Sequence, residues 1–331
     1  DPYTQAFNLS LPIKAWITIA RAFLRDNTKL LILDESSAAL DFDSTERLFK
    51  KMRELRDNGV AVFIVTHRIA ELVRISDKAT VMRDGKDVGV LEKKDLNEKN
   101  LIGLMTGRAE TGEKTTSVAV QTKTDKVVMR AENLVVWPES KPVNFEVKRG
   151  EIVGVTGLDG NGQDDFVKIL AGVQESHGGT TEISDGNGKF IKYNSLDDAK
   201  RNGISFVSGD RKKEGILPNL SIYENLVVPL YKKTSRAGFL GFVDWLELNG
   251  IFDWEVDRLS IKTGPRDNLI TSLSGGNQQK VMIARSFAQH PKVLILNDPA
   301  RGIDVSTKRD LYVHLRNFVE EGNTVIFLSS E

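Results

Sequence analysis

A glycine-rich loop in the middle of the chain has the spacing of a phosphate-binding site. The loop contains Gly157, Gly160 and Gly162, follows the apolar segment 151–156, and precedes a helical pattern that begins at Phe166. Glycines let backbone N–H groups converge on phosphate oxygens, and the start of a helix adds positive potential. The alternative is a tight turn between a strand and a helix, which needs glycine only for its backbone conformation.

Two positions of this loop depart from the phosphate-binding template G-x-x-x-x-G-K-[ST]. Gln163 stands where the template has lysine, and Asp164, followed by Asp165, stands where it has serine or threonine. The first change removes a cation that would neutralise phosphate, and the second places a carboxylate beside it. Like charges about 4 Å apart repel by about 1 kcal/mol in water and by more in a partly buried site. The sequence therefore predicts weak nucleotide binding at this loop.

The string LSGGNQQ at residues 273–279 indicates a second anion site, because it precedes another helical pattern. The Ser274 hydroxyl and the N–H groups of Gly275 and Gly276 would stand at a helix start, where anions bind. Together with Gln278, this string resembles the signature motif of ABC ATPases. The chain most closely resembles the tandem ATPase subunits of simple-sugar importers of the ribose, galactose and xylose type. The resemblance also covers DPARGIDV, the stretch GDRKKEG and the terminal SSE, and it extends over essentially the whole chain.

The resemblance implies a fold, cofactors and roles for several side chains. The fold would be α/β, a P-loop NTPase of the ABC cassette type with a parallel-sheet core and a helical subdomain, and the cofactors would be ATP and Mg²⁺. Asp34 matches the family's magnesium-associated aspartate, and Glu35 matches the general base that polarises the attacking water. Asp41 follows in the next loop as a further nucleotide-site residue, and His67 matches the switch histidine that contacts the γ-phosphate. Taken alone, these residues would be an acidic strand end and a structural histidine.

An internal repeat gives the domain organisation. Four blocks of sequence, the first at Ile19–Phe23, recur in the same order 263 or 264 residues later. Both copies have the pattern helix, strand, helix, strand, which predicts parallel sheets covered by helices. We therefore expect two tandem units, the first incomplete, with roughly 138 of its residues missing from this chain. The expected boundaries are 1–108 for the C-terminal part of the first cassette, 109–126 for a polar linker and 127–331 for the second cassette.

The two copies differ at the positions that carry chemistry. The second copy has Asn297 and Asp298 in place of the two acids, and Ser330 in place of the histidine. Asparagine lacks the charge that Mg²⁺ prefers, and aspartate reaches one methylene less than glutamate. In the first copy the signature position begins with Ser10 and has Pro12, which lacks an N–H donor, so this segment is expected to be a helix start.

In the family, each nucleotide lies between the phosphate loop of one unit and the signature of the other. The resemblance thus implies one hydrolytic site, which uses Asp34, Glu35 and His67 with the signature at 274–278. It also implies one degenerate site, at which every part departs from the pattern. The chain by itself should not hydrolyse ATP efficiently, because the phosphate loop of the first unit is not in it.

Composition and the remaining segments limit the class of partner. The chain has 46 Lys and Arg residues and 46 Asp and Glu residues, so we do not expect a basic surface that binds nucleic acid. It has no cysteine, so we do not expect thiol chemistry. Residues 221–260, with Trp245 and Trp254, would form the helical subdomain that docks on a membrane partner. The alternative is a helical insertion with buried tryptophans. Gly209 stands where the family's coupling loop has glutamine or glutamate.

We expect a peripheral protein at the cytoplasmic face of the membrane. Its partners would be transmembrane permease subunits and a solute-binding protein, with no nucleic acid. Two other functions remain open from the sequence: a truncated, non-hydrolytic cassette that serves only as a binding module, and a soluble tandem cassette that acts on ribosomes or nucleic acid.

Overall fold

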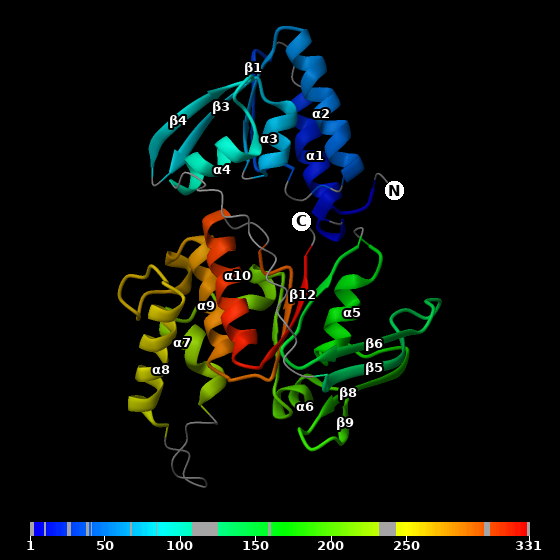
Figure 1. Cartoon of the computed structure of the whole chain (residues 1–331). Helices are drawn as coiled ribbons and strands as arrows, with labels where there is room; N and C mark the ends of the chain where they lie inside the picture. The colour runs from blue at the N-terminus through cyan, green and yellow to red at the C-terminus, as the bar shows by residue number, and fades with distance from the viewer. Residues whose placement is uncertain are drawn as a thin grey trace. The chain divides into compact units, whose positions relative to one another are not determined.

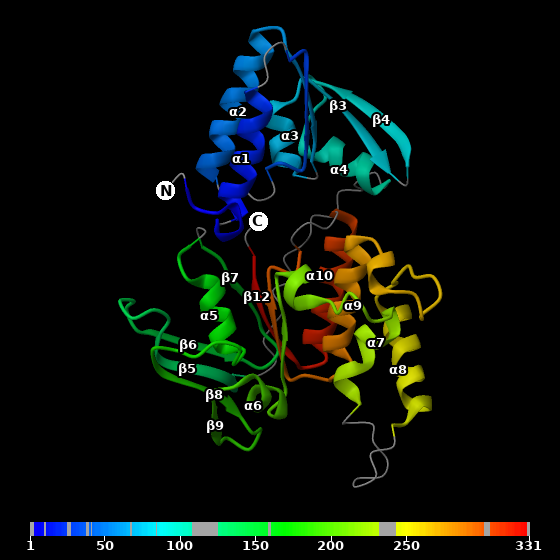
Figure 2. The ribbon, with the colours of Figure 1, turned by 180° about the vertical axis from the view of Figure 1, so that it is seen from behind.

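The chain divides into two compact units, residues 1–116 and 117–331 (Figures 1 and 2). The computed structural model describes residues 3–9, 11–24, 28–37, 40, 42–66, 68–83, 85–107, 125–157, 160–231, 243–300 and 305–329. The linker expected at 109–126 falls almost entirely outside these residues, so its boundaries stay a prediction.

Unit 1 is built on a two-stranded parallel sheet. Strand β1 (Leu30–Asp34) pairs with β2 (Ala61–Val65) in parallel, so both strands end at the same edge. Helices α1 (Leu11–Phe23) and α2 (Phe42–Asp57) are amphipathic, and their apolar faces bury one face of this sheet. The other elements of unit 1 are η1 (Ala6–Asn8), α3 (Ile69–Ile75), the antiparallel pair β3 (Lys78–Arg83) and β4 (Lys86–Glu92), and α4 (Glu98–Thr106).

Unit 2 contains a four-stranded parallel sheet and a four-stranded antiparallel sheet. The parallel sheet has the order β10 (Ile204–Val207), β11 (Val293–Asn297), β12 (Thr324–Leu328), β7 (Ile152–Val155). The antiparallel sheet has the order β6 (Val143–Lys148), β5 (Val127–Val135), β8 (Gly178–Ser184), β9 (Phe190–Tyr193). The helices of this unit are α5 (Gln163–Leu170), α6 (Leu196–Arg201), α7 (Ile222–Val227), α8 (Trp245–Arg258), α9 (Gly275–Phe287) and α10 (Val305–Glu320), with short turns η2 (Arg211–Gly215), η3 (Val228–Leu230) and η4 (Ile270–Ser272).

Both faces of the parallel sheet in unit 2 are covered. One apolar cluster joins β11 and β12 to α5 and the antiparallel sheet, and another joins the opposite face to α7, α8, α9 and α10 (Figure 2). Every residue of β11 is consequently buried. This double coverage explains why the central strands are continuous apolar runs rather than alternating ones.

Helix α5 begins at Gln163, three residues before the start expected from the sequence. Gly162 ends the loop with φ of +88°, and Asp164 and Asp165 occupy the first helical turn, where carboxylates suit the helix dipole. The apolar periodicity becomes visible only at Phe166, so the pattern alone placed the start of this helix too late.

The segment expected to form a helical subdomain contains α7, η3 and α8 among its described residues. The Ser221 and Glu224 side chains form a capping box at the start of α7, and Asp244 accepts hydrogen bonds from the first turn of α8. Trp245 and Trp254 are 57% and 67% exposed, so the alternative of buried tryptophans is wrong. Within the described residues, none of the helices is both long and apolar enough to cross a membrane.

Candidate functional site

The turn after the first strand of each repeat, β1 in unit 1 and β11 in unit 2, is built in the same way in both units. Glu35 has φ of +46° and Asp298 has φ of +45°, a left-handed conformation that is uncommon for residues other than glycine. The Glu35 N–H donates to the Val65 carbonyl at 2.8 Å, and the Asp298 N–H donates to the Leu328 carbonyl at 3.0 Å. Such a conformation persists only where the surrounding structure holds it, and it often occurs at active sites. The turn therefore fixes where these two carboxylates stand.

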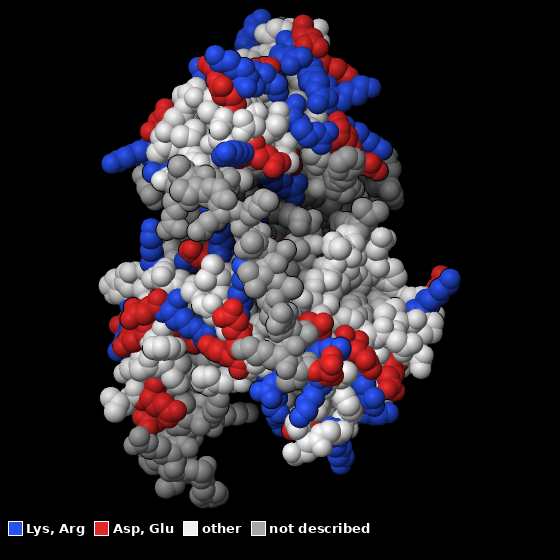
Figure 3. Space-filling model, viewed as in Figure 1, with Lys and Arg blue, Asp and Glu red and all other residues white. Residues whose placement is uncertain are grey.

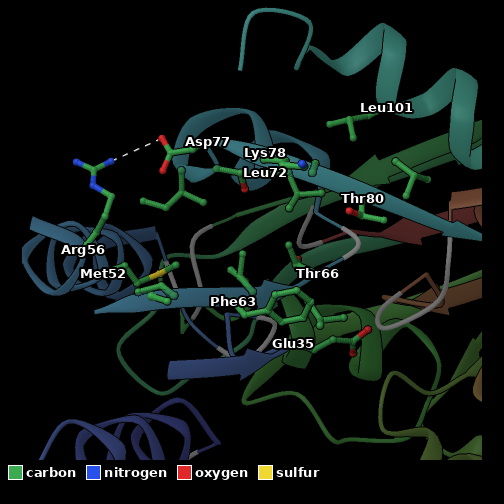
Figure 4. Close-up of a pocket in the computed structure, with 18 of the residues that line it drawn as sticks. Glu35, Met52, Arg56, Phe63, Thr66, Leu72, Asp77, Lys78, Thr80 and Leu101 are labelled. Atoms are coloured by element: carbon green, nitrogen blue, oxygen red, sulfur yellow. Dashed lines mark ion pairs between the residues drawn. The ribbon is translucent and has the colours of Figure 1, made fainter. Parts of the chain in front are cut away.

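In unit 1, this turn places the acids at the edge where β1 and β2 end. Asp34 is the last residue of β1, lies opposite Val65 and is exposed. Glu35 lines a cavity of about 900 Å³ whose walls come from unit 1 alone. Figure 4 shows Glu35 near Thr66, the residue that follows β2. Asp41 and His67 lie outside the described residues.

The loop after β1 is tied to helix α3. The Ser37 hydroxyl donates to Glu71 at 2.6 Å, and both groups are buried. Arg68 pairs with Glu71 at 3.0 Å and donates to the Ser37 carbonyl at 3.1 Å. Ser37 lies just after β1 and Arg68 lies just after β2, so these contacts hold the ends of the two strands together.

One face of the β1–β2 sheet is an open apolar surface. Ile32 and Phe63 are 61% and 58% exposed, whereas their repeat equivalents Ile295 and Ile326 are both 0% exposed. In unit 2, that face is covered by α5 and by the antiparallel sheet. The described part of unit 1 has no such layer.

The phosphate loop of unit 2 connects β7 to α5. Gly160 and Gly162 have φ of +82° and +88°, and a Cβ at Gly162 would lie 3.2 Å from the Trp137 ring. The indole N–H of Trp137 donates to Asp165 at 2.7 Å. The Gln163 amide points back to the Gly157 carbonyl at 3.5 Å. The loop thus has the glycine conformations of a phosphate cradle, together with an indole packed against it.

The polar groups of this loop do not fit Mg²⁺ and nucleotide well. Asp164, at the template's hydroxyl position, accepts a hydrogen bond from the Asn297 amide at 2.5 Å and pairs with Lys168 at 2.6 Å. Asp298 is buried at 7% exposure. A carboxylate therefore stands where a hydroxyl would contact the metal, and an amide stands where a carboxylate would bind it.

The signature segment forms the start of helix α9. Ser274 is the N-cap residue, but its hydroxyl makes no capping bond and instead accepts from the Asn277 amide at 3.0 Å. The first intrahelical bond runs from the Gln278 N–H to the Ser274 carbonyl, which leaves the N–H groups of Gly275 and Gly276 outside the helical ladder. The Gln278 side chain donates to the Leu273 carbonyl at 3.0 Å and holds the preceding turn. This geometry suits anion binding at an exposed helix start.

Arg211 contributes to the signature region, a role that was not predicted for it from the sequence. Its guanidinium donates to the Gly275 carbonyl at 3.0 Å, and a Cβ at Gly275 would lie 3.0 Å from it. Burial lowers the pKa of Arg211, but arginine stays charged at any physiological pH. The signal that could have revealed it was the resemblance of the GDRKKEG stretch.

Gly209 has a packing reason for being glycine. A Cβ there would lie only 2.8 Å from the Asn297 carbonyl oxygen. The strand end of β11 thus approaches the segment after β10 too closely for a side chain at position 209.

Residues 140–301 match the sequence pattern of the ABC transporter family. An ABC transporter domain therefore makes up this part of the chain. It is 34% identical to the ribose import ATP-binding protein of Clostridium perfringens over 331 residues, 100% of this chain and 64% of that protein. It is 36% identical to the corresponding protein of Lactococcus lactis over 98% of this chain and 64% of that protein. It is 32% identical to the galactose/methyl galactoside import ATP-binding protein of Mannheimia succiniciproducens, again over 64% of its length.

Solved ABC cassettes share the fold. A dimeric cassette in a post-hydrolysis state, bound to ADP and Pi, has a TM-score of 0.52 and 24% identity, with 61% of this chain and 88% of that chain covered. A cassette of the cbiONQ transporter complex of Clostridium perfringens has a TM-score of 0.50 and 22% identity, with 62% and 80% covered. The predicted ABC cassette fold is confirmed. The roles of the individual site residues stay predictions.

Proposed function

We propose that the chain is the larger part of an ATPase subunit that energises import of a sugar or similar small solute, with one catalytic and one degenerate nucleotide site. The chain spans just under two thirds of the length of its curated relatives, 64%, so the proposal concerns the longer protein that contains it. The solute class comes from the printed names of those relatives, which are ribose and galactose importers.

The observation that carries the proposal is the distribution of intact and altered parts between the units. Unit 1 has Asp34 and Glu35 at an exposed strand end, and unit 2 has an intact signature helix start. The altered parts, Gln163, Asp164 and Asn297, belong instead to the phosphate loop and strand end of unit 2 itself. We infer that the acids of unit 1 and the signature of unit 2 serve the same nucleotide.

Each residue of the catalytic set then has a chemical role. Bound Mg²⁺ and ATP would supply the electrophilic γ-phosphoryl group. Asp34 would hold the metal, and Glu35 would take a proton from the attacking water. His67 would contact the γ-phosphate. Ser274 and the first N–H groups of α9 would stabilise the negative charge that develops on the phosphoryl oxygens.

The partners in this proposal are permease subunits in the membrane and a solute-binding protein. Helix α8 supports a docking role because Trp245, Leu246 and Trp254 are exposed on it. Exposed aromatic and aliphatic side chains of this kind are typical of interaction surfaces. The protein would then be peripheral, at the cytoplasmic face of the membrane.

The test uses the longer protein and two matched variants. Glu35→Gln should lower single-turnover ATP hydrolysis by about 10²–10⁴-fold, the usual contribution of a general base. The control, Asp298→Asn, removes the equivalent carboxylate of unit 2 and should leave the rate within about twofold. Wild-type protein should hydrolyse one nucleotide per chain.

Other outcomes would point elsewhere. Rapid hydrolysis of two nucleotides per chain, or equal loss in both variants, would refute the assignment of one catalytic site. No hydrolysis in the longer protein would favour the binding-module function. Stimulation of hydrolysis by ribosomes, and not by permease in vesicles, would favour the soluble cassette.

A further inference from the structure

The phosphate loop of unit 2 differs from a magnesium site by an exchange of groups, not only by loss. A phosphate loop offers a serine or threonine hydroxyl to Mg²⁺, and the neighbouring strand offers an aspartate. In unit 2, the carboxylate is on helix α5 as Asp164, and the neutral amide is on strand β11 as Asn297. The two positions together still carry one carboxylate, but it has moved from the strand to the helix.

The moved carboxylate is bonded on both of its oxygens. Asp164 Oδ1 accepts from Asn297 Nδ2 at 2.5 Å, across 133 positions of sequence. Asp164 Oδ2 pairs with Lys168 Nζ at 2.6 Å, one helical turn further along α5. Asn297 is 4% exposed, so its amide needs a hydrogen-bond partner, and Asp164 supplies one.

Lys168 supplies a permanent positive charge at this place. Burial lowers the pKa of Lys168, but the hydrogen bond and charge of Asp164 outweigh it, with a further contribution from Glu214, so that the net pKa is raised. The ammonium is therefore protonated throughout the physiological pH range. The carboxylate thus has a cation beside it without any metal ion.

We propose that Asp164, Asn297 and Lys168 form a metal-free clasp that joins α5 to β11 and holds the phosphate loop of unit 2 in one conformation without nucleotide. The proposal deepens the degenerate half of the proposed function and rests on it. Where Mg²⁺ and phosphate would link loop and strand in a working cassette, the clasp makes that link from side chains alone. The loop of unit 2 would then be a fixed structural part that does not respond to Mg²⁺ or ATP.

The neighbouring groups favour a clasp over a metal site. Asp165, the adjacent carboxylate, is directed to the Trp137 indole and not to Asp164. Gly209 lets the strand end that carries Asn297 pack closely against the next segment. Among the described residues, no cluster of three or more acids or histidines could hold a metal ion.

The decisive variant is Asn297→Asp, which places a second carboxylate against Asp164. We expect the unfolding midpoint of unit 2 to fall by roughly 4–8 °C in the absence of divalent ions, because a carboxylate at the buried position 297 would repel the carboxylate of Asp164. Mg²⁺ or Mn²⁺ should restore most of this loss, because two facing carboxylates make a divalent site. Wild-type protein should show no such response. Mn²⁺ binding to the variant can be followed by electron paramagnetic resonance.

A second readout reports on the loop and does not depend on the stability of the variant. Trp137 contacts the loop at Gly162, and a protein with the other three tryptophans, Trp16, Trp245 and Trp254, changed to Phe isolates its fluorescence. Acrylamide quenching of Trp137 should be unchanged by Mg²⁺-ATP. Asp164→Asn, which keeps the shape but removes the pair with Lys168, should increase quenching at least about twofold, because the loop loosens.

Two results would overturn the clasp. One is quenching in the wild-type background that changes on addition of Mg²⁺-ATP. The other is an Asn297→Asp protein that is as stable as wild type without divalent ions. Neither readout uses hydrolysis, so failure of the single-catalytic-site proposal would appear separately, in the stoichiometry experiment.

Discussion

A buried carboxyl group on helix α8 gives a prediction with a defined sign and size. Glu255 is 2% exposed, and its Oε2 has no hydrogen-bond partner within the described residues. Burial raises the pKa of Glu255 from 4.5 to about 7, against the opposing effect of Arg258 and with a small contribution from Glu321. The Arg258 guanidinium is 3.5 Å away, a weak pairing that does not offset the burial.

The sign of the effect follows from proton binding. Between pH 4.5 and about 7 the folded protein keeps a proton on Glu255 that the unfolded chain has lost. Stability is therefore greatest below the unfolded pKa, falls as the pH rises, and is constant above about pH 7. A pKa difference of about 2.5 units corresponds to about 3 kcal/mol, the largest loss this group can cause.

Replacing Glu255 by Gln removes the charge and keeps the shape. The variant should match wild type near about pH 4 and exceed it by up to about 3 kcal/mol near about pH 8, a rise in unfolding midpoint of about 6–12 °C. Thermal unfolding at the two pH values measures this, with Glu175→Gln, an exposed position, as the control. Equal pH dependence in the Glu255→Gln variant and wild type would refute the reasoning.

Three further predictions concern the other features of the two units. Arg211→Met should reduce ATP hydrolysis by the longer protein about 3–10-fold, because the hydrogen bond to the Gly275 carbonyl is lost. The control Lys213→Met, at a side chain that is 84% exposed, should leave the rate unchanged. Equal rates in both variants would exclude a role for Arg211 in the signature region. Ile32→Thr should lower binding of an apolar dye by the isolated chain without loss of stability, because Ile32 is exposed. Ile295→Thr, at the equivalent buried position, should lower the free energy of unfolding by about 2–4 kcal/mol. A similar loss of stability in both variants would mean that this face of the unit 1 sheet is covered. Trp254→Ala should leave the unfolding midpoint nearly unchanged but weaken binding of permease subunits in a pull-down from vesicles, and unchanged binding would exclude this tryptophan from the docking surface.

The local features of this protein were predictable from its sequence because they depend on near neighbours. An apolar run ending in acids marked β1, and the repeat matched it to β11 at an offset of 263 residues. The left-handed turn at Glu35 and Asp298 was not predictable, because its conformation depends on the hydrogen bond to the end of the next strand. The start of α5 was misplaced for a related reason, since a helix beginning with Gln-Asp-Asp shows no apolar periodicity.

The candidate site shows the same division more sharply. The sequence by itself determined that the phosphate loop of unit 2 lacks its lysine and hydroxyl and that the strand end carries an amide. From the sequence alone, these changes are separate losses that place unfavourable charge in one site. Only the tertiary structure brings Asp164, Asn297 and Lys168 together, because the parallel sheet and α5 join positions 133 residues apart. Likewise, the exposure of Ile32 and the burial of Ile295 in similar strands are decided by the layer that packs on each sheet and not by the residues themselves.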